Sequence, residues 1–147
     1  MYSKFLLALG FCFSVAQVSS AAPDQSCPDL SGTYTCTDSL GQAPWTYIGH
    51  QSVNENGHTI FNGIVADGVT YHGGDPDSGT SYVYRNYCQS SIFVMEEHGT
   101  YLNGDGIPTD YNVGSINYRD PSGNYISEIL VDGTIERVIT CVKQVKP

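Results

Sequence analysis

Tyrosines are the side chains of this sequence best suited to contact a ligand. Tyr82 and Tyr84 stand two residues apart in SYVYRNYC, where they alternate with Ser81, Val83 and Arg85. A regular strand places residues two apart on the same face. A tyrosine offers a large apolar ring and a hydroxyl group that can orient a ligand. We therefore expect Tyr82 and Tyr84 to face a ligand, with Trp45, the single tryptophan, as a further candidate.

A calcium site is a second possibility, in the segment NGDGIPTDYN over residues 103–112. Calcium takes oxygen ligands, which proteins often supply from alternating positions around a glycine turn. Asn103, Asp105 and Asp110 could supply three such oxygens. The alternative, which we favour, is an Asp-Gly turn followed by a proline, with no ion bound. No other cofactor is expected.

Catalytic signatures are missing from the sequence. It has no G-x-S-x-G elbow, no H-E-x-x-H pair and no glycine-rich phosphate loop. The four histidines lie near predicted turns or strand ends, and no spacing pairs one of them with Glu96 or Glu97 as a dyad. An enzyme is therefore the least supported class, and non-catalytic binding is the expected role.

The N-terminus has the pattern of a secretory signal peptide. Lys4 is followed by the uncharged run FLLALGFCFSVA, which is shorter than the roughly 20 residues that a membrane-spanning helix needs. Small residues at Ser19 and Ala21 then fit a cleavage site. We expect residues 1–21 to be removed, residues 22–147 to form one domain, and the protein to be secreted or periplasmic, with no membrane attachment after cleavage.

The charge of the chain limits its partners. Six basic and 15 acidic residues give a net charge of −9, and loss of Lys4 with the signal peptide makes it more negative by one. Nucleic acids and anionic membranes both require basic surface, so neither is expected as a partner. A basic protein would suit this charge, although an acidic surface also serves solubility alone.

Four cysteines follow the signal peptide, and an even number in an exported chain predicts two disulfides. No close Cys-x-x-Cys or Cys/His spacing suggests a metal instead. Three pairings are possible. If the first and last strands are neighbours, Cys36 can bridge to Cys141, which leaves Cys27 for Cys88.

The composition after residue 30 is that of a β protein, rich in Tyr, Thr, Val, Ile and Gly. Asn-Gly and Asp-Gly pairs recur, and these pairs favour tight hairpins. Two longer polar segments, 72–80 and 98–110, are expected to be loops. The pattern predicts an all-β fold, a single antiparallel barrel of eight or nine strands with a β-sandwich as the alternative, and strands near 31–37, 44–52, 58–66, 69–72, 80–89, 91–97, 111–119, 124–131 and 134–143.

The segment LSGTY, Leu30 to Tyr34, resembles the first strand of the calycin barrels, which include lipocalins and avidins. In that strand a glycine precedes an aromatic residue that plugs one end of the barrel, and Gly32 and Tyr34 match these positions. Lipocalins often pair the aromatic residue with a late arginine, a role that the resemblance gives to Arg137. The resemblance implies a barrel that holds a small, largely apolar ligand in its mouth.

A second resemblance points to a different role. SGTSY, Ser78 to Tyr82, resembles the Ser-Gly-x-x-Tyr pattern of the small periplasmic inhibitors of C-type lysozyme (the MliC type). Those proteins are disulfide-bearing barrels in which an inserted loop occupies the acidic cleft of the enzyme. The resemblance implies that Ser78 and Tyr82 contact a cationic, lysozyme-like hydrolase. Inhibition of such a protein is the alternative to small-ligand binding.

Overall fold

The computed structural model describes residues 27–145, whose regular elements are β-strands and one short 3-10 helix. The prediction of an all-β fold is confirmed. The signal peptide expected over residues 1–21 lies outside the described residues. No helix within residues 27–145 is long and apolar enough to cross a membrane.

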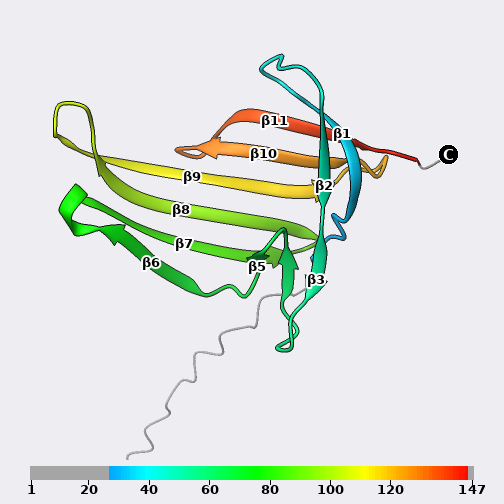
Figure 1. The fold of residues 1–147 in the computed structure, drawn as a ribbon, viewed down its shortest axis with the longest axis horizontal. Coiled ribbons are helices and arrows are strands. Elements are labelled where there is room, and N and C mark those ends of the chain that lie inside the picture. Colours follow the sequence, from blue (N-terminus) through cyan, green and yellow to red (C-terminus); the bar gives the residue numbers. More distant parts are fainter. Residues whose placement is uncertain (1–26, 146–147) are drawn as a thin grey trace, which may run out of the picture.

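Eight strands form one antiparallel sheet, called here the main sheet, in the order β2-β1-β11-β10-β9-β8-β7-β6. From β6 to β11 each strand pairs with the next one along the chain, and β1 then pairs with β11 (Figure 1). The strands are β1 (Gly32–Asp38), β2 (Trp45–Gly49), β6 (Thr70–Asp75), β7 (Thr80–Gln89), β8 (Ile92–Leu102), β9 (Pro108–Arg119), β10 (Tyr125–Val131) and β11 (Thr134–Lys143).

The turns between these strands follow from local sequence. Asp132 and Gly133 both adopt positive φ, 49° and 77°, which is the conformation of the two-residue turn that matches strand twist. Ser90 and Ser91 make a similar turn between β7 and β8, with φ of 51° and 62°. Asp120 accepts the backbone N–H groups of Ser122 and Asn124 and so closes the turn between β9 and β10.

A closed barrel is not found among the described residues, because β2 and β6 are the two edges of the main sheet. Strands 44–52 and 58–66 were predicted to be part of the barrel wall. The chain instead leaves the main sheet after Gly49. The residues that follow form a separate three-stranded sheet, the small sheet, in the order β3-β4-β5. Its strands are β3 (Gln51–Val53), β4 (Thr59–Phe61) and β5 (Ile64–Val65). These residues pair with one another and therefore do not join β2 to β6.

The two segments expected to be long loops are mainly strand. β8 and β9 extend to Leu102 and Pro108, so only residues 103–107 of the predicted loop 98–110 form the turn. Likewise β6 continues to Asp75, and a 3-10 helix, Pro76–Ser78, makes the connection to β7. Both segments are rich in Gly, Asp and Thr, and this composition led to the prediction of loops. They form strands because cross-strand pairing outweighs local propensity here.

The core lies between the small sheet and one end of the main sheet. Phe61 of β4 places its ring 5.9 Å from that of Phe93 on β8 and 6.1 Å from that of Tyr125 on β10. β1 and β2 complete this end, where Tyr34 and Leu30 are fully buried. In Figure 1 the other end of β6–β9 projects beyond this region.

Two disulfides close the same end of the molecule. Cys36 bonds to Cys141, its direct neighbour in the pairing of β1 with β11. Cys27 bonds to Cys88 and so ties the segment before β1 to the end of β7. The pairing suggested by adjacent first and last strands is confirmed, although it arises in an open sheet.

Candidate ligand-binding face

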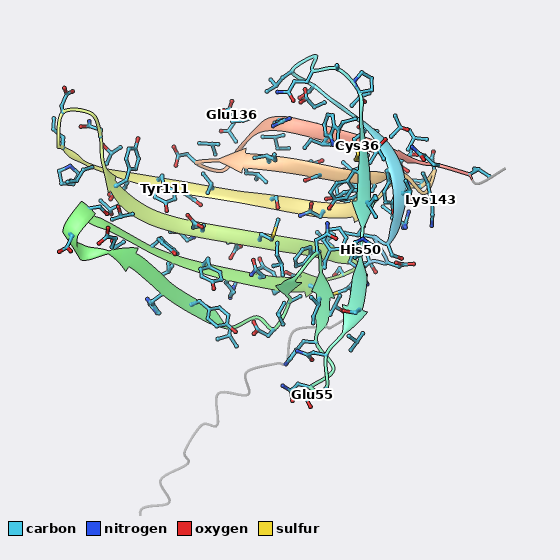
Figure 2. All side chains as sticks on the ribbon, in the orientation of Figure 1. Cys36, His50, Glu55, Tyr111, Glu136 and Lys143 are labelled. Carbon is cyan, nitrogen blue, oxygen red and sulfur yellow. A yellow bond between two sulfur atoms is a disulfide. The ribbon has the colours of Figure 1, made fainter. Side chains whose placement is uncertain are left out.

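One face of the main sheet, called here the inner face, carries both the core and the predicted ligand-facing residues. Strand alternation places Phe93, Met95 and Glu97 on this face of β8. The small sheet covers the Phe93 end. Figure 2 shows Tyr111 at the opposite end of the sheet, far from Cys36. The inner face therefore has a covered end and an uncovered end.

Five tyrosines gather at the uncovered end, and we call them the tyrosine patch: Tyr71, Tyr82, Tyr84, Tyr101 and Tyr111. The Tyr71 and Tyr84 rings are stacked, with centroids 5.2 Å apart and planes inclined by 18°. Tyr82 lies 6.3 Å from Tyr84, and Tyr101 lies 6.0 Å from Tyr111. The prediction that Tyr82 and Tyr84 share a face agrees with their adjacent rings. The other three tyrosines were not predicted as part of one surface, since they come from β6, β8 and β9.

Two glycines set the direction of the tyrosine rings. Gly73 lies opposite Tyr82, and a Cβ atom on Gly73 would stand 2.4 Å from the Tyr82 ring. Gly99 lies opposite Tyr111, and a Cβ atom there would stand 2.6 Å from the Tyr111 hydroxyl oxygen. Each ring thus lies across a glycine of the neighbouring strand, an arrangement that packs the ring and shields the glycine backbone.

Glu97 stands beside the tyrosine patch, opposite Tyr84 on the neighbouring strand. Its Oε1 atom accepts a hydrogen bond of 2.6 Å from the Tyr111 hydroxyl. This bond, with some loss of hydration and the carboxylate charge, raises the pKa of Tyr111 to about 12. Tyr111 therefore keeps its proton well above neutral pH and remains the donor to Glu97.

A groove of about 540 Å³ runs between the tyrosine patch and the small sheet. We call it the inner groove. Ile64 of the small sheet stands at one side, and strands β7–β10 provide the floor. Its lining is Ile64, Tyr82, Tyr84, Asn86, Met95, Glu96, Glu97, Val113, Gly114, Ser115 and Ile129. Apolar side chains and tyrosine rings thus surround a small number of polar groups, which is the usual character of a small-molecule site.

The opposite face of the main sheet carries other hollows. One, of about 490 Å³, lies over Val94, Ile116 and Leu130. Another, of about 660 Å³, is a polar depression that includes His72 and His98. We assign the candidate site to the inner groove, because the tyrosine patch borders it and the small sheet supplies a wall.

Trp45 lies apart from this site. It begins β2 opposite Cys36 and packs, partly buried, against the core at the covered end. The structure does not place it in the inner groove with Tyr82 and Tyr84. An aromatic residue on an edge strand can serve the core as well as a ligand, and its neighbours are decided by long-range pairing.

Tyr34 is fully buried, and the arginine that contacts it is Arg119 instead of the Arg137 that the calycin resemblance implies. The Tyr34 hydroxyl donates toward the carbonyl oxygens of Leu30 and Ser31. Arg119 of β9 donates to that hydroxyl at 3.0 Å, and its guanidinium carbon lies 5.9 Å from the Tyr34 ring centroid. Arg137 instead pairs with the buried carboxylate of Asp38, at 2.5 Å.

Arg119 was missed because the resemblance selected an arginine by its place late in the chain. Its other donors bind the carbonyl oxygens of Asp29 and Gly123, which joins the segment before β1 to the turn before β10. Gly32 precedes Tyr34 with a φ of 145°, in the region that favours glycine. The pair Gly32 and Tyr34 therefore has a structural role at the covered end.

Ser78 lies in the connection between β6 and β7, where its hydroxyl is engaged locally. It donates to the carbonyl oxygen of Asp75 at 3.0 Å and lies 2.8 Å from the Thr80 hydroxyl. Gly79 packs close to Leu102, so the β6–β7 connection lies against the end of β8. Ser78 and Tyr82 are thus on the same hairpin, with Ser78 exposed at its tip.

The predicted calcium ligands lie in one hairpin, where the side chains of Asn103 and Asp110 accept hydrogen bonds from the hairpin itself. Asn103 Oδ1 accepts the backbone N–H groups of Asp105 and Ile107, each at 3.0 Å. Asp110 Oδ1 accepts the Thr100 hydroxyl at 2.7 Å across β8 and β9. Within residues 27–145 no group of three His, Cys, Asp or Glu side chains could hold a metal ion. The segment has the contacts of a hydrogen-bonded turn.

Comparison with known proteins adds no family to this description. No family model, no curated protein and no solved structure matches the chain. The resemblances to calycins and to lysozyme inhibitors stay predictions that depend on short motifs. Function is therefore inferred from the residues and their geometry.

Proposed function

We propose that this is an exported, non-catalytic binding protein that holds a small, largely apolar ligand in the inner groove. The observation that carries the proposal is the uncovered half of the inner face, where Tyr82 and Tyr84 of the tyrosine patch line a mainly apolar groove. This site differs from the expected barrel mouth. The groove has a floor and one side wall, whereas the mouth of a barrel is enclosed all round. The two disulfides support an oxidising, extracellular compartment.

Two adjacent residues of β10 allow a matched test of this groove. Ile129 lines the inner groove, whereas Leu130 lines the hollow on the opposite face. Binding of the neutral, apolar dye Nile red is measured by fluorescence for the wild type, Ile129→Asn and Leu130→Asn. An asparagine in the groove replaces apolar contact with a polar group, so Ile129→Asn should weaken dye binding about tenfold.

The paired variant supplies the control, since it makes the same change at a similar depth on the other face. Leu130→Asn should bind the dye as the wild type does. Loss of binding in Leu130→Asn alone would move the site to the opposite face, and no dye binding by the wild type would overturn the proposal. Native mass spectrometry of the exported protein should show extra mass that leaves on denaturation.

A second candidate function is inhibition of a cationic, lysozyme-like hydrolase by the hairpin tips. The observation that favours it is the contact between Gly79 and Leu102, which joins the β6–β7 and β8–β9 ends into one surface. Leu102 is 43% exposed and Ile107 is 58% exposed there. Assay of a C-type lysozyme with the wild type and Ser78→Trp tests this function. Absence of inhibition by the wild type would exclude it.

A further inference from the structure

We propose that the ligand of the inner groove is an amphiphilic cation, whose ammonium group binds between Glu97 and Tyr84 while its apolar part lies along Met95, Val113 and Ile129. This inference rests on the proposed function, because it names the ligand class of the same groove.

The charge distribution around the groove is the first support. Glu96 and Glu97 are the charged residues in its lining. The Glu96 side chain belongs to the opposite face, where it pairs with Arg85 at 3.2 Å and accepts the Tyr87 hydroxyl. Glu97 is therefore the charged group that the described residues present to the inner groove.

No arginine of the described chain neutralises Glu97. Arg85 pairs with Glu96, and Arg137 pairs with Asp38. Arg119 donates to Tyr34 and to backbone carbonyl oxygens at the covered end. A carboxylate in a partly buried, apolar surrounding gains from an opposite charge nearby. A cationic ligand would supply that charge.

The hydrogen bonding of Glu97 leaves room for such a ligand. Tyr111 donates its hydroxyl proton to Oε1. For Oε2, residues 27–145 provide no hydrogen-bond donor, since the hydrogen bond of this carboxylate is the one from Tyr111 to Oε1. An ammonium group can approach Oε2 without displacing the Tyr111 bond.

The aromatic rings give the second, independent support. Tyr71 on β6 stacks on Tyr84 of β7, and Glu97 lies on the other side of Tyr84, on β8. The Tyr84 face that is not stacked is therefore directed toward the strand of Glu97. A cation over a tyrosine face is attracted by the ring quadrupole, and quaternary ammonium ligands are commonly bound by aromatic side chains.

The rest of the groove suits the apolar part of the ligand. Met95, Val113 and Ile129 lie on three adjacent strands of the floor, and Ile64 stands at the side. Met95 can adapt to irregular apolar shapes because its side chain is flexible. The net charge of −9 would also raise the rate at which a cation reaches the protein.

The experiment compares three probes that share an eight-carbon chain: octyltrimethylammonium, 1-octanol and octanoate. Isothermal titration calorimetry measures each against the wild type, Glu97→Gln and Tyr84→Ala at low salt. A cation–π contact and a partly exposed ion pair together predict about tenfold tighter binding of the ammonium probe than of octanol. Octanoate should bind more weakly than octanol.

Glu128→Gln is the matched control, because Glu128 accepts the Tyr118 hydroxyl at 2.9 Å across β9 and β10, as Glu97 accepts that of Tyr111. Tyr118 and Glu128 do not line the inner groove. Glu97→Gln should reduce the preference for the ammonium probe to within about twofold and leave octanol binding unchanged. Glu128→Gln should keep the wild-type preference.

The outcomes separate the ligand class from the proposed function. Equal binding of all three probes, lost in Tyr84→Ala, would overturn the cation inference and keep the groove as a binding site. A preference for ammonium that survives Glu97→Gln would also overturn the inference. If neither octanol nor the ammonium probe binds the wild type, the proposed function itself fails.

Discussion

The covered and uncovered ends of the inner face are made of similar residue types and differ in what lies over them. Tyr34 and Tyr125 at the covered end are 0% and 6% exposed, whereas Tyr71 and Tyr101 at the uncovered end are 39% and 43% exposed. Both disulfides are at the covered end. This molecule therefore keeps its stability and its accessible aromatic surface in separate places.

The separation has a structural cause in the small sheet. Phe61 brings an apolar side chain onto Phe93 and Tyr125, and Ile64 marks the point at which the cover ends. Beyond that point the strands of the main sheet are held by pairing with their neighbours. A tyrosine tolerates this half-exposed position better than a leucine or isoleucine, because its hydroxyl can contact water.

The largest expected effect is loss of the disulfides at the covered end. Removing a native disulfide from a small exported domain typically costs about 2–5 kcal/mol of unfolding free energy. Unfolding by urea, followed with and without reductant, should therefore show a large drop in the midpoint. An unchanged midpoint would show that the Cys27–Cys88 and Cys36–Cys141 bonds do not stabilise this end.

A pair of alanine variants on β8 compares the two ends directly. Phe93 and Tyr101 are both inner-face residues of this strand, 2% and 43% exposed. Phe93→Ala should cost about 3–5 kcal/mol, because it leaves a cavity in the core. Tyr101→Ala should cost less than about 1 kcal/mol, as expected for a surface substitution. Equal losses of unfolding free energy would contradict the division into two ends.

Arg119 allows a sharper test of what holds the covered end. Arg119→Met removes donors to Tyr34, Asp29 and Gly123, and hydrogen bonds of charged groups are each worth about 1.5–3 kcal/mol. Arg85→Met, the control, removes an exposed ion pair worth about 0–1 kcal/mol. Thermal unfolding of the two variants should rank Arg119→Met as clearly the less stable. The reverse order of stability would show that Arg119 does not stabilise the covered end.

The smallest expected effect is a pH dependence at the uncovered end. The Tyr111 hydrogen bond to Glu97 raises the pKa of Tyr111 from 10.0 to about 12. Because the raised pKa belongs to the folded state, its stabilising contribution is present below pH 10 and is lost as the pH rises through about 12. Tyrosinate absorbance should lose one late-titrating group in Tyr111→Phe, while the buried Tyr125, whose pKa is also raised, still titrates late.

The variant Glu97→Gln tests whether Glu97 causes the raised pKa of Tyr111. Glu97→Gln removes the charge and should lower the pKa of Tyr111 toward 10.0, its ordinary value. Glu128→Gln should leave Tyr111 unchanged and act on Tyr118 instead, since Tyr118 donates to Glu128. An unchanged pKa of Tyr111 in Glu97→Gln would show that Glu97 does not raise it.

Part of the candidate site followed from the sequence, because alternation within one strand is a local property. Tyr82 and Tyr84 were expected on one face, and their rings are neighbours. Tyr71 and Tyr111 could not be added to them, since β6 and β9 contribute these residues only through strand register. The role of Gly73 and Gly99, which is to leave space for a tyrosine ring, likewise can be seen only when the cross-strand tyrosine is known.

At 72–80 and 98–110 the local residue types gave a wrong prediction, because they indicated loops where most of the residues are in strands. Gly, Asp and Thr favour turns, yet His98–Leu102 pairs with Pro108–Asn112 as regular strand. Backbone hydrogen bonds across a long hairpin outweigh the weak preferences of single residues. The hairpin turn itself, around Asn103 and Gly106, agrees with the Asn and Asp-Gly signals.

The sequence by itself determined that the fold is all-β, where several hairpins turn, and which cysteines become neighbours if the terminal strands meet. These depend on local periodicity, on backbone conformations that glycine and asparagine permit, and on the oxidation of paired thiols. Only the tertiary structure decided that β2 and β6 remain edges, that Arg119 reaches Tyr34, and that the tyrosine patch stays uncovered. The physical reason is that alternation assigns a side chain to a face, while the choice of neighbouring strands and of the cover depends on packing throughout the molecule.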